Sequence, residues 1–482
     1  MAEIILDLES LADRHIDKSE KFKHKTSNQY RLFPFTTKWS YNHYNEFVYF
    51  RGILGEVYRN LYKKELPKEL KSSENYHLKL KEKLLEEALS KVQVNTPLQK
   101  QKLTQFLEDM FFEDGNLFCF APSTLPYLTF KSDNSTLKQI SSFIYEVFLS
   151  HSSIEENTNS VQESTNILYD IIQKSLPGLE DRKYTRHGYV IWNKEIIECF
   201  VEDYMLLIED EKFFLQHIDS LLKHYYFIYI SQIALEIDDF CAPKEHPLFF
   251  LLETEIVSKN REGFRAGWAM LEKRLNIIFS HANTLELINY IKIDDVSIGN
   301  YRDIKAKWEQ LNDANKTKLL LCIKNLEEYY ISLITDPKTG WERCYDTLEA
   351  NLRFKKMTCP LEKAIYRFWY IVDYQFLNTG RQARYKDYSL WFTEFCKANF
   401  IKRRGRTGNT LKIDQEMLLF LTKLCIGKNP RIRLKSLWTE LSKRGVNFDE
   451  SSKMEVVKLF EKINLIEKKS DSGDAQYVRT IL

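Results

Sequence analysis

Apolar residues recur at the three- and four-residue spacing of an α-helix through most of residues 167–400. Stretches such as CAPKEHP, NDANK and DPKTGW interrupt this spacing with polar residues, proline or glycine. The pattern predicts seven to ten helices that pack as a bundle or an irregular array. The chain shows no fixed-period self-similarity, which argues against a regular solenoid.

Residues 401–482 predict a different order of elements. After the basic run IKRRGRTG, a helical pattern extends from Ile413 to Gly427, the tripeptide RIR favours a short strand, and a second helical segment ends at Gly445. Asp449 is a suitable N-cap for a third helix. We expect Ser452 and Lys453 to begin the outward face of this helix. Its expected inward residues are Met454, Val457, Phe460 and Ile463.

The segments LIEKK and AQYVRTIL alternate apolar and polar residues on either side of SDSGD, which predicts a β-hairpin. Helix, short strand, helix, helix and hairpin is the order of a winged helix. We therefore predict a mainly α fold, with an irregular multi-helix body and a C-terminal winged-helix domain that carries a small β-hairpin. The expected divisions are 1–150 (aromatic-rich and mainly helical), 151–400 (helical body) and 401–482 (basic linker plus winged helix).

Aromatic side chains are concentrated in residues 1–60. Such a set can form a stacking platform for single-stranded nucleic acid, but we favour a hydrophobic core. FRGILGEVYRNLY predicts a helix despite its two glycines, and the charged segment 61–110 predicts helices with solvated faces. FFEDGNLFCFAPSTLPYLTF (111–130) suggests a short hairpin or an irregular packing segment, and the polar residues 151–166 suggest a mobile loop. The aromatic residues concerned are Tyr30, Phe33, Phe35, Trp39, Tyr41, Tyr44, Phe47, Tyr49 and Phe50.

Composition agrees with a helical protein. Glycine (15) and proline (11) are scarce among 482 residues, which argues against a β-sandwich. No apolar run approaches the length of a membrane span, and the N-terminal segment lacks the features of a signal peptide. Eight scattered cysteines without a Cys-x-x-Cys pair suggest reduced thiols. We expect a cytoplasmic protein that does not contact a membrane.

The charge is unevenly distributed. Residues 401–482 hold 18 Lys and Arg against 10 Asp and Glu, whereas the other 400 residues hold 52 against 58. A basic terminal module on a mildly acidic body is typical of nucleic-acid contact. A continuous positive face from Arg381 through Arg406 is an alternative that we do not favour. Within the winged helix, four acids on the third helix oppose phosphate binding. The predicted DNA-binding residues are Arg403, Arg404, Arg406, Lys453, Lys458, Lys462, Lys468, Lys469 and Arg479.

Candidate catalytic patterns are weak. The chain has no Gly-x-x-x-x-Gly-Lys-Ser/Thr loop and no His-Glu-x-x-His motif, so we predict no nucleotide hydrolysis, no metal and no cofactor. His217 and His224 share a helix face, which is more typical of structural histidines than of ligands. A metal-dependent nuclease needs clustered acids and a lysine. Only one segment offers that order, with Asp294, Asp295, Asp303 and Lys305, and it reads largely as the start of a helix.

RRGRTGNTLKIDQEMLLFLTKLCIG and RGVNFDESSKMEVVKLFEKINLIEKKSDSGDAQYV resemble the C-terminal part of the DptG (DndG) family. The segments RLFPFTT and FRGILGEVYRNLY are also similar to that family. The resemblance implies a subunit of a bacterial antiviral restriction system that depends on DNA phosphorothioation, acting as a protein complex with NTP-driven motor subunits. It carries over no catalytic motif, so we expect a subunit that is not an enzyme.

Three hypotheses follow from these observations. The chain contacts DNA through the basic run and the hairpin, or it is a pure protein–protein scaffold with no DNA contact. The third hypothesis, a cryptic metal-dependent nuclease, rests on the acidic segment alone.

Overall fold

Twenty-three α-helices dominate the residues that the structure describes, and the strands are short and gathered in small sheets. The computed structural model describes residues 3–71, 76–113, 116–131, 134–157, 167–335, 340–468 and 476–480. The prediction of a mainly helical protein is confirmed. Within these residues, no helix combines the length and the apolar character that crossing a membrane requires.

The described residues among the first 150 form helices and the four short strands β1 to β4. Their elements are β1 (Ile4–Leu6), α1 (Leu8–His15), η1 (Tyr41–His43), α2 (Tyr44–Tyr49), α3 (Arg51–Tyr62), β2 (Lys64–Glu65), α4 (Lys68–Lys71), α5 (Tyr76–Ser90), α6 (Pro97–Phe111), β3 (Phe112–Glu113), β4 (Asn116–Leu117), η2 (Pro122–Tyr127), α7 (Ser135–Ile144) and the π-helix η3 (Tyr145–Leu149). The predicted hairpin is present as β3 and β4.

The following part, up to residue 400, is the helical body. Its elements are α8 (Ser152–Asn157), α9 (Ile167–Ser175), β5 (Glu180–Asp181), α10 (Lys194–Leu207), α11 (Glu211–Ile237), β6 (Leu251–Leu252), α12 (Glu262–Arg265), α13 (Trp268–Leu275), α14 (Ile278–Ile288), β7 (Ile291–Ile293), β8 (Val296–Ser297), α15 (Tyr301–Gln310), α16 (Asp313–Leu333), α17 (Trp341–Ala350), α18 (Leu352–Lys356), α19 (Pro360–Asn378) and α20 (Gln382–Asn399). The described residues from α9 to α20 thus hold twelve helices rather than seven to ten, since short helices such as α12 and α18 carry too few residues to show a period. The predicted loop 151–166 begins with α8, and its remainder from 158 lies outside the described residues.

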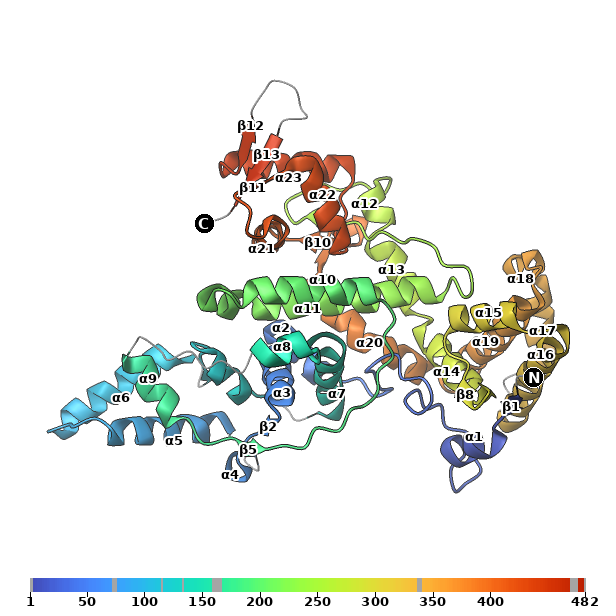
Figure 1. Cartoon of the computed structure of the whole chain (residues 1–482), viewed down its shortest axis with the longest axis horizontal. Coiled ribbons are helices and arrows are strands. Elements are labelled where there is room, and N and C mark those ends of the chain that lie inside the picture. Colours follow the sequence, from blue (N-terminus) through green and yellow to red (C-terminus); the bar gives the residue numbers. More distant parts are fainter. Residues whose placement is uncertain are drawn as a thin grey trace.

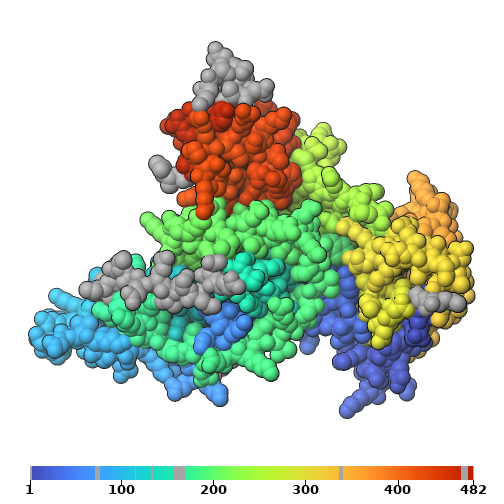
Figure 2. Space-filling view, viewed as in Figure 1, coloured from blue at the N-terminus to red at the C-terminus, as the bar shows by residue number. Residues whose placement is uncertain are grey.

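The C-terminal lobe, residues 409–468 and 476–480, stands on this body (Figure 2). β9 (Ile401–Arg403) and η4 (Gly405–Thr407) precede the lobe. The elements of the lobe are β10 (Asn409–Ile413), α21 (Gln415–Ile426), β11 (Arg431–Arg433), α22 (Leu434–Lys443), α23 (Glu450–Lys462), β12 (Ile466–Lys468) and β13 (Gln476–Arg479). Asp414 and Asp449 cap α21 and α23 by accepting backbone N–H groups. β11, β13 and β12 form an antiparallel sheet at the end of the lobe away from the body (Figure 1).

Two hydrophobic cores organise the molecule. The larger core extends through the body and the C-terminal lobe, and its longest element is α11, whose middle is buried on all sides. The smaller core lies in an arm formed by α4, α5, α6 and α9 (Figure 1). The lobe therefore shares its core with the body, whereas the arm has its own.

Most aromatic residues of the first sixty belong to the larger core, as favoured over a stacking platform. Tyr30, Phe33, Phe35, Phe47 and Phe50 are buried. The N-terminal segment is also held by Glu286, whose buried carboxylate accepts the backbone N–H groups of residues 28–30 at 2.9–3.2 Å. Two aromatic rings of this stretch remain more than half exposed, Tyr41 and Tyr49.

The two glycines of α3 permit a close contact that larger residues cannot make. A Cβ atom on Gly55 would overlap the carbonyl oxygen of Leu128, and that oxygen also accepts a hydrogen bond from Arg59 Nη1 at 2.8 Å. We expect Gly55→Ala to lower the free energy of unfolding by about 1–3 kcal/mol, because overpacking displaces Leu128. Gly178→Ala is the matched control, since its Cβ would meet no atom within 4 Å. Urea denaturation of both variants checks this, and equal midpoints would contradict the contact.

Candidate nucleic-acid interface

The basic run that follows α20 forms a β-hairpin instead of the expected linker. β9 pairs antiparallel with β10, and β10 pairs in parallel with β6 of the body. Arg404 Nε donates to Thr410 Oγ1 at 2.8 Å, and its Nη2 donates to the Leu252 carbonyl oxygen at 2.9 Å. Arg404 therefore has a structural role, because its guanidinium is bound to Thr410 and to the backbone of the body. Arg403 and Arg406 are exposed, and neither has an ion-pair partner among the described residues.

The predicted DNA-binding lysines of α23 are largely neutralised by acids of the same helix. Lys453 Nζ donates to Glu450 Oε1 at 2.8 Å, and Lys458 Nζ donates to Glu455 Oε1 at 2.7 Å. Lys462 is exposed and has no ion pair within the part of the chain that the structure describes. The helix consequently offers little net positive charge to a phosphate backbone.

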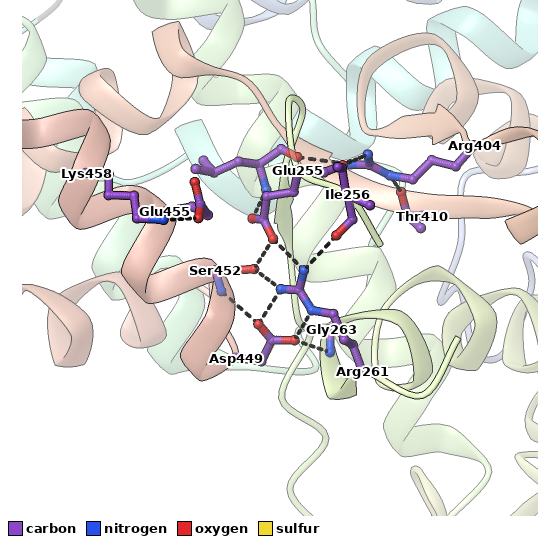
Figure 3. A network of polar contacts seen from close by, with 11 residues as sticks. Glu255, Ile256, Arg261, Gly263, Arg404, Thr410, Asp449, Ser452, Glu455 and Lys458 are labelled. Carbon is purple, nitrogen blue, oxygen red and sulfur yellow. Dashed lines mark hydrogen bonds and ion pairs between the residues drawn. The ribbon is translucent and has the colours of Figure 1, made fainter. Parts of the chain in front are cut away.

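The N-terminal end of α23 is bound to the body by a polar network (Figure 3). The Arg261 guanidinium donates to both carboxylate oxygens of Asp449, at 2.6 and 3.0 Å, and to Ser452 Oγ at 2.8 Å. Glu255 Oε2 accepts from Ser452 Oγ at 3.0 Å and pairs with Arg261 Nη1 at 2.8 Å. Burial opposes ionisation of Asp449, but Arg261 and the backbone N–H groups of Ser452 and Gly263 outweigh it and lower the pKa of Asp449 to about 2.

This docking corrects two expectations for α23. Ser452 was expected to face outward and is fully buried, because its hydroxyl lies in the network with the body. Met454 was expected to face inward and is 58% exposed, while Val456 fills the core in its place. In helix-turn-helix proteins the first residues of the corresponding helix contact base edges. Here the same end of the helix faces the protein.

The three-stranded sheet of the lobe has one apolar and one charged face. Ile432, Val478 and Ile466 lie opposite one another across the strands, and Val478 is fully buried. Because side chains alternate along a strand, the residues next to these three point to the other face. We call that outward face the arginine face. It comprises Arg431, Arg433, Glu467, Tyr477 and Arg479.

The charges of the arginine face are only partly compensated. Arg431 Nη1 donates to Glu467 Oε2 at 2.8 Å, and its guanidinium lies over the Tyr477 ring, 4.7 Å from the centroid. Arg479 Nε lies 3.7 Å from the same Glu467 oxygen, and its side chain is 58% exposed. Arg433 is exposed, with no partner in the described ranges. Among its described residues, the arginine face therefore carries three arginines and one glutamate, and Arg433 and Arg479 are exposed.

Sequence reasoning found Arg479 and missed Arg431 and Arg433. The sequence contains a signal for these two residues, because RIR favours a strand and the two-residue period of a strand places both arginines on one face. The pairing of β11 with β13 is what brings them beside Arg479. Lys468 ends β12, but its side chain lies outside the described residues, as does all of Lys469.

The positive face considered from Arg381 through Arg406 is not continuous, because most residues in the middle of α20 (Gln382–Asn399) are buried. Arg381 Nη1 donates to His24 Nδ1 at 2.7 Å and lies just before α20, whereas Arg403 follows its other end. A helix of 18 residues separates the two positions by about 27 Å. These residues therefore contribute to different surfaces.

The acidic residues of the nuclease hypothesis do not form a cluster. Asp294 and Asp295 make the turn between β7 and β8, with φ angles of 50° and 63°. Asp303 accepts the N-cap backbone N–H of α15 at 2.9 Å in a capping box, and Lys305 pairs with Glu362 at 3.0 Å. Asp294 Oδ1 accepts the backbone N–H of Glu3 at 2.8 Å, so Asp294, Asp303 and Lys305 have structural partners, and the expected helix is present as α15.

The two histidines of α11 are structural. His224 is fully buried, its Nε2 lies 2.8 Å from the Arg444 carbonyl oxygen, and burial lowers its pKa to about 4. His217 stacks on Phe420, with ring centroids 4.7 Å apart. Across the described ranges, no group of three or more His, Cys, Asp and Glu side chains is arranged to hold a metal ion.

Comparison with known proteins adds no relative. No protein-family model matches the chain, and no curated protein matches it significantly.

Proposed function

We propose that this protein is a DNA-contacting, non-catalytic subunit of a bacterial DNA phosphorothioation-dependent restriction complex. The observation that supports DNA contact is the arginine face, where Arg431 and Arg479 lie beside the single carboxylate of Glu467 and Arg433 is exposed without a partner among the described residues. The assignment to the DptG (DndG) family rests on the resemblance of the C-terminal segments. In this proposal the partner subunits supply NTP-driven motion, and this chain supplies affinity for DNA.

We further propose that the C-terminal lobe is a winged helix that contacts DNA through its sheet. The order α21, β11, α22, α23, β12 and β13, with the sheet order β11-β13-β12, supports this assignment. The N-terminal end of α23 is engaged with Arg261 and Glu255, and two of its lysines are paired within the helix. The sheet is therefore the surface of the lobe that is best suited to phosphate groups.

The chemistry of the arginine face suits the DNA backbone. A guanidinium binds a phosphate through two parallel N–H donors and stays charged at any physiological pH. Arg433 and Arg479 have the freedom to do so, because both are exposed. Such contacts fix position and affinity without reading sequence. Lys462, at the end of α23 before β12, would extend this contact, whereas Arg403 and Arg406 lie at the end of the lobe next to the body and would contact a different part of the duplex.

A pure scaffold is the second candidate function. The outward side of α23 supports it, because Met454 is 58% exposed between charge-paired lysines, which favours a protein partner over a phosphate backbone. In that case the lobe would dock on a motor subunit through α23.

The salt dependence of DNA binding tests the proposal. Three to five phosphate contacts predict that the logarithm of the association constant falls with the logarithm of salt concentration with a slope of about −3 to −5 between about 50 and 200 mM. Fluorescence anisotropy of a labelled duplex with the purified chain measures this slope. Absence of binding at the lowest salt concentration would overturn DNA contact and leave the scaffold.

A further inference from the structure

A cavity of about 680 Å³ that is open to solvent is lined by residues of α12 and α13 and by Asp238 at the C-terminal end of α11. Figure 1 labels these three helices. Phe264, Met270 and Ile277 form an apolar wall in this cavity. Arg265 and Lys273 also line it, are exposed, and have no hydrogen-bond or ion-pair partner within the described residues. The cavity therefore combines an apolar surface with free cations.

The acidic side chain in the cavity lining, Asp238, is already occupied. Arg353 Nη1 donates to Asp238 Oδ1 at 2.9 Å, and Arg274, which also lines the cavity, forms a second ion pair with this carboxylate. His281 Nε2 lies 3.8 Å away, and burial lowers the pKa of His281 to about 3, so the ring is neutral. The neighbouring acid, Asp239, binds His246 at 2.6 Å.

One carboxylate therefore faces two guanidinium groups, and no further acid lines the cavity. Burial, followed by repulsion from Arg353, lowers the pKa of Arg274. An anionic ligand would relieve this repulsion, because an opposite charge nearby favours the charged guanidinium. Asp238 would hold Arg274 in place beside the ligand through their ion pair.

We propose that this cavity binds a nucleoside phosphate. The phosphate group is held by Arg265, Lys273 and Arg274, and the base lies on the wall formed by Phe264 and Met270. Inorganic phosphate alone would leave this wall in water, whereas a flat base gains contact with an aromatic ring. The inference depends on the cavity and its charges, and it holds whether or not the arginine face contacts DNA.

Calorimetric titration of the full chain with dAMP, inorganic phosphate and deoxyadenosine tests the site. We expect dAMP to bind with a Kd below about 1 mM and at least about tenfold more tightly than either of its parts. Absence of dAMP binding would overturn the proposal. Equal affinity for phosphate and dAMP would overturn it too, because the apolar wall would then contribute nothing.

Substitutions of the lining residues test whether the ligand binds in the cavity. Charge reversal of Arg265 or Lys273 to Glu is expected to weaken dAMP binding at least about tenfold. The matched control is Lys259→Glu, an exposed reversal outside the cavity lining, which should leave the Kd unchanged. Phe264→Ala is expected to weaken dAMP and to leave phosphate binding as it is. An unchanged dAMP affinity in both charge reversals would show that binding, if present, occurs elsewhere and would overturn the site.

Discussion

Replacing Arg431, Arg433 and Arg479 together by Glu is expected to reduce the affinity for duplex DNA at least about a hundredfold near physiological salt. Each arginine is taken to contact one phosphate, so the slope of affinity against salt should become shallower by about 3. The reversal also brings three new carboxylates towards Glu467, so the modified sheet would repel the duplex. Anisotropy titrations at several salt concentrations measure both quantities.

A matched triple variant separates this local effect from a change in total charge. Lys318, Lys355 and Lys356 are exposed on the body, and their replacement by Glu changes the net charge by the same amount. It should alter DNA affinity only slightly. Because Arg431 pairs with Glu467, circular dichroism must show that the first variant is folded. The single change Arg433→Glu removes no partner and should still weaken DNA binding by about threefold to tenfold. Equal losses of DNA affinity in the Arg triple variant and in the Lys control variant would contradict a role for the arginine face.

The elements of the C-terminal lobe were predictable because their signals are local. Gly427 and Gly445 lie at positive φ just after their helices, and Asp449 accepts the backbone N–H of Ser452 at 2.9 Å as an N-cap. A two-residue period is equally local, so Arg431 and Arg433 could have been placed on one face. The position of Arg479 beside them could not be predicted, since it depends on which strand β13 pairs with.

The contacts that redefine the site join residues that are distant in sequence. Ser452 bonds to Arg261 across 191 positions, and no periodicity in α23 reveals that a polar residue there is buried. The parallel pairing of β10 with β6 likewise converts an expected linker into part of a sheet. Charge composition indicates a basic module, but it does not distinguish Arg404, which binds backbone carbonyls, from the exposed Arg403 and Arg406.

A buried ion pair joins the lobe to the body and fixes the orientation of the lobe. Arg444, just after α22, donates from Nε and Nη2 to the two Asp203 oxygens of α10 at 2.8 and 2.6 Å. Tyr225 donates its hydroxyl to the same carboxylate at 2.6 Å. Burial disfavours the charged guanidinium, but the bonds to Asp203 outweigh this and raise the pKa of Arg444. Both side chains of the pair are almost fully buried.

We expect Arg444→Met to lower the free energy of unfolding by about 3–5 kcal/mol, because Asp203 would remain as a buried charge without a cation. The double variant Arg444→Met with Asp203→Leu should recover much of this loss, since it removes both charges and fills the space with apolar groups. Lys443→Ala, at the exposed neighbouring position, is the control and should leave the midpoint unchanged. Urea denaturation followed by tryptophan fluorescence compares the four proteins. A single variant as stable as the parent would mean that the lobe is held to the body by its apolar contacts alone, and the arginine face would then have no fixed direction relative to the body.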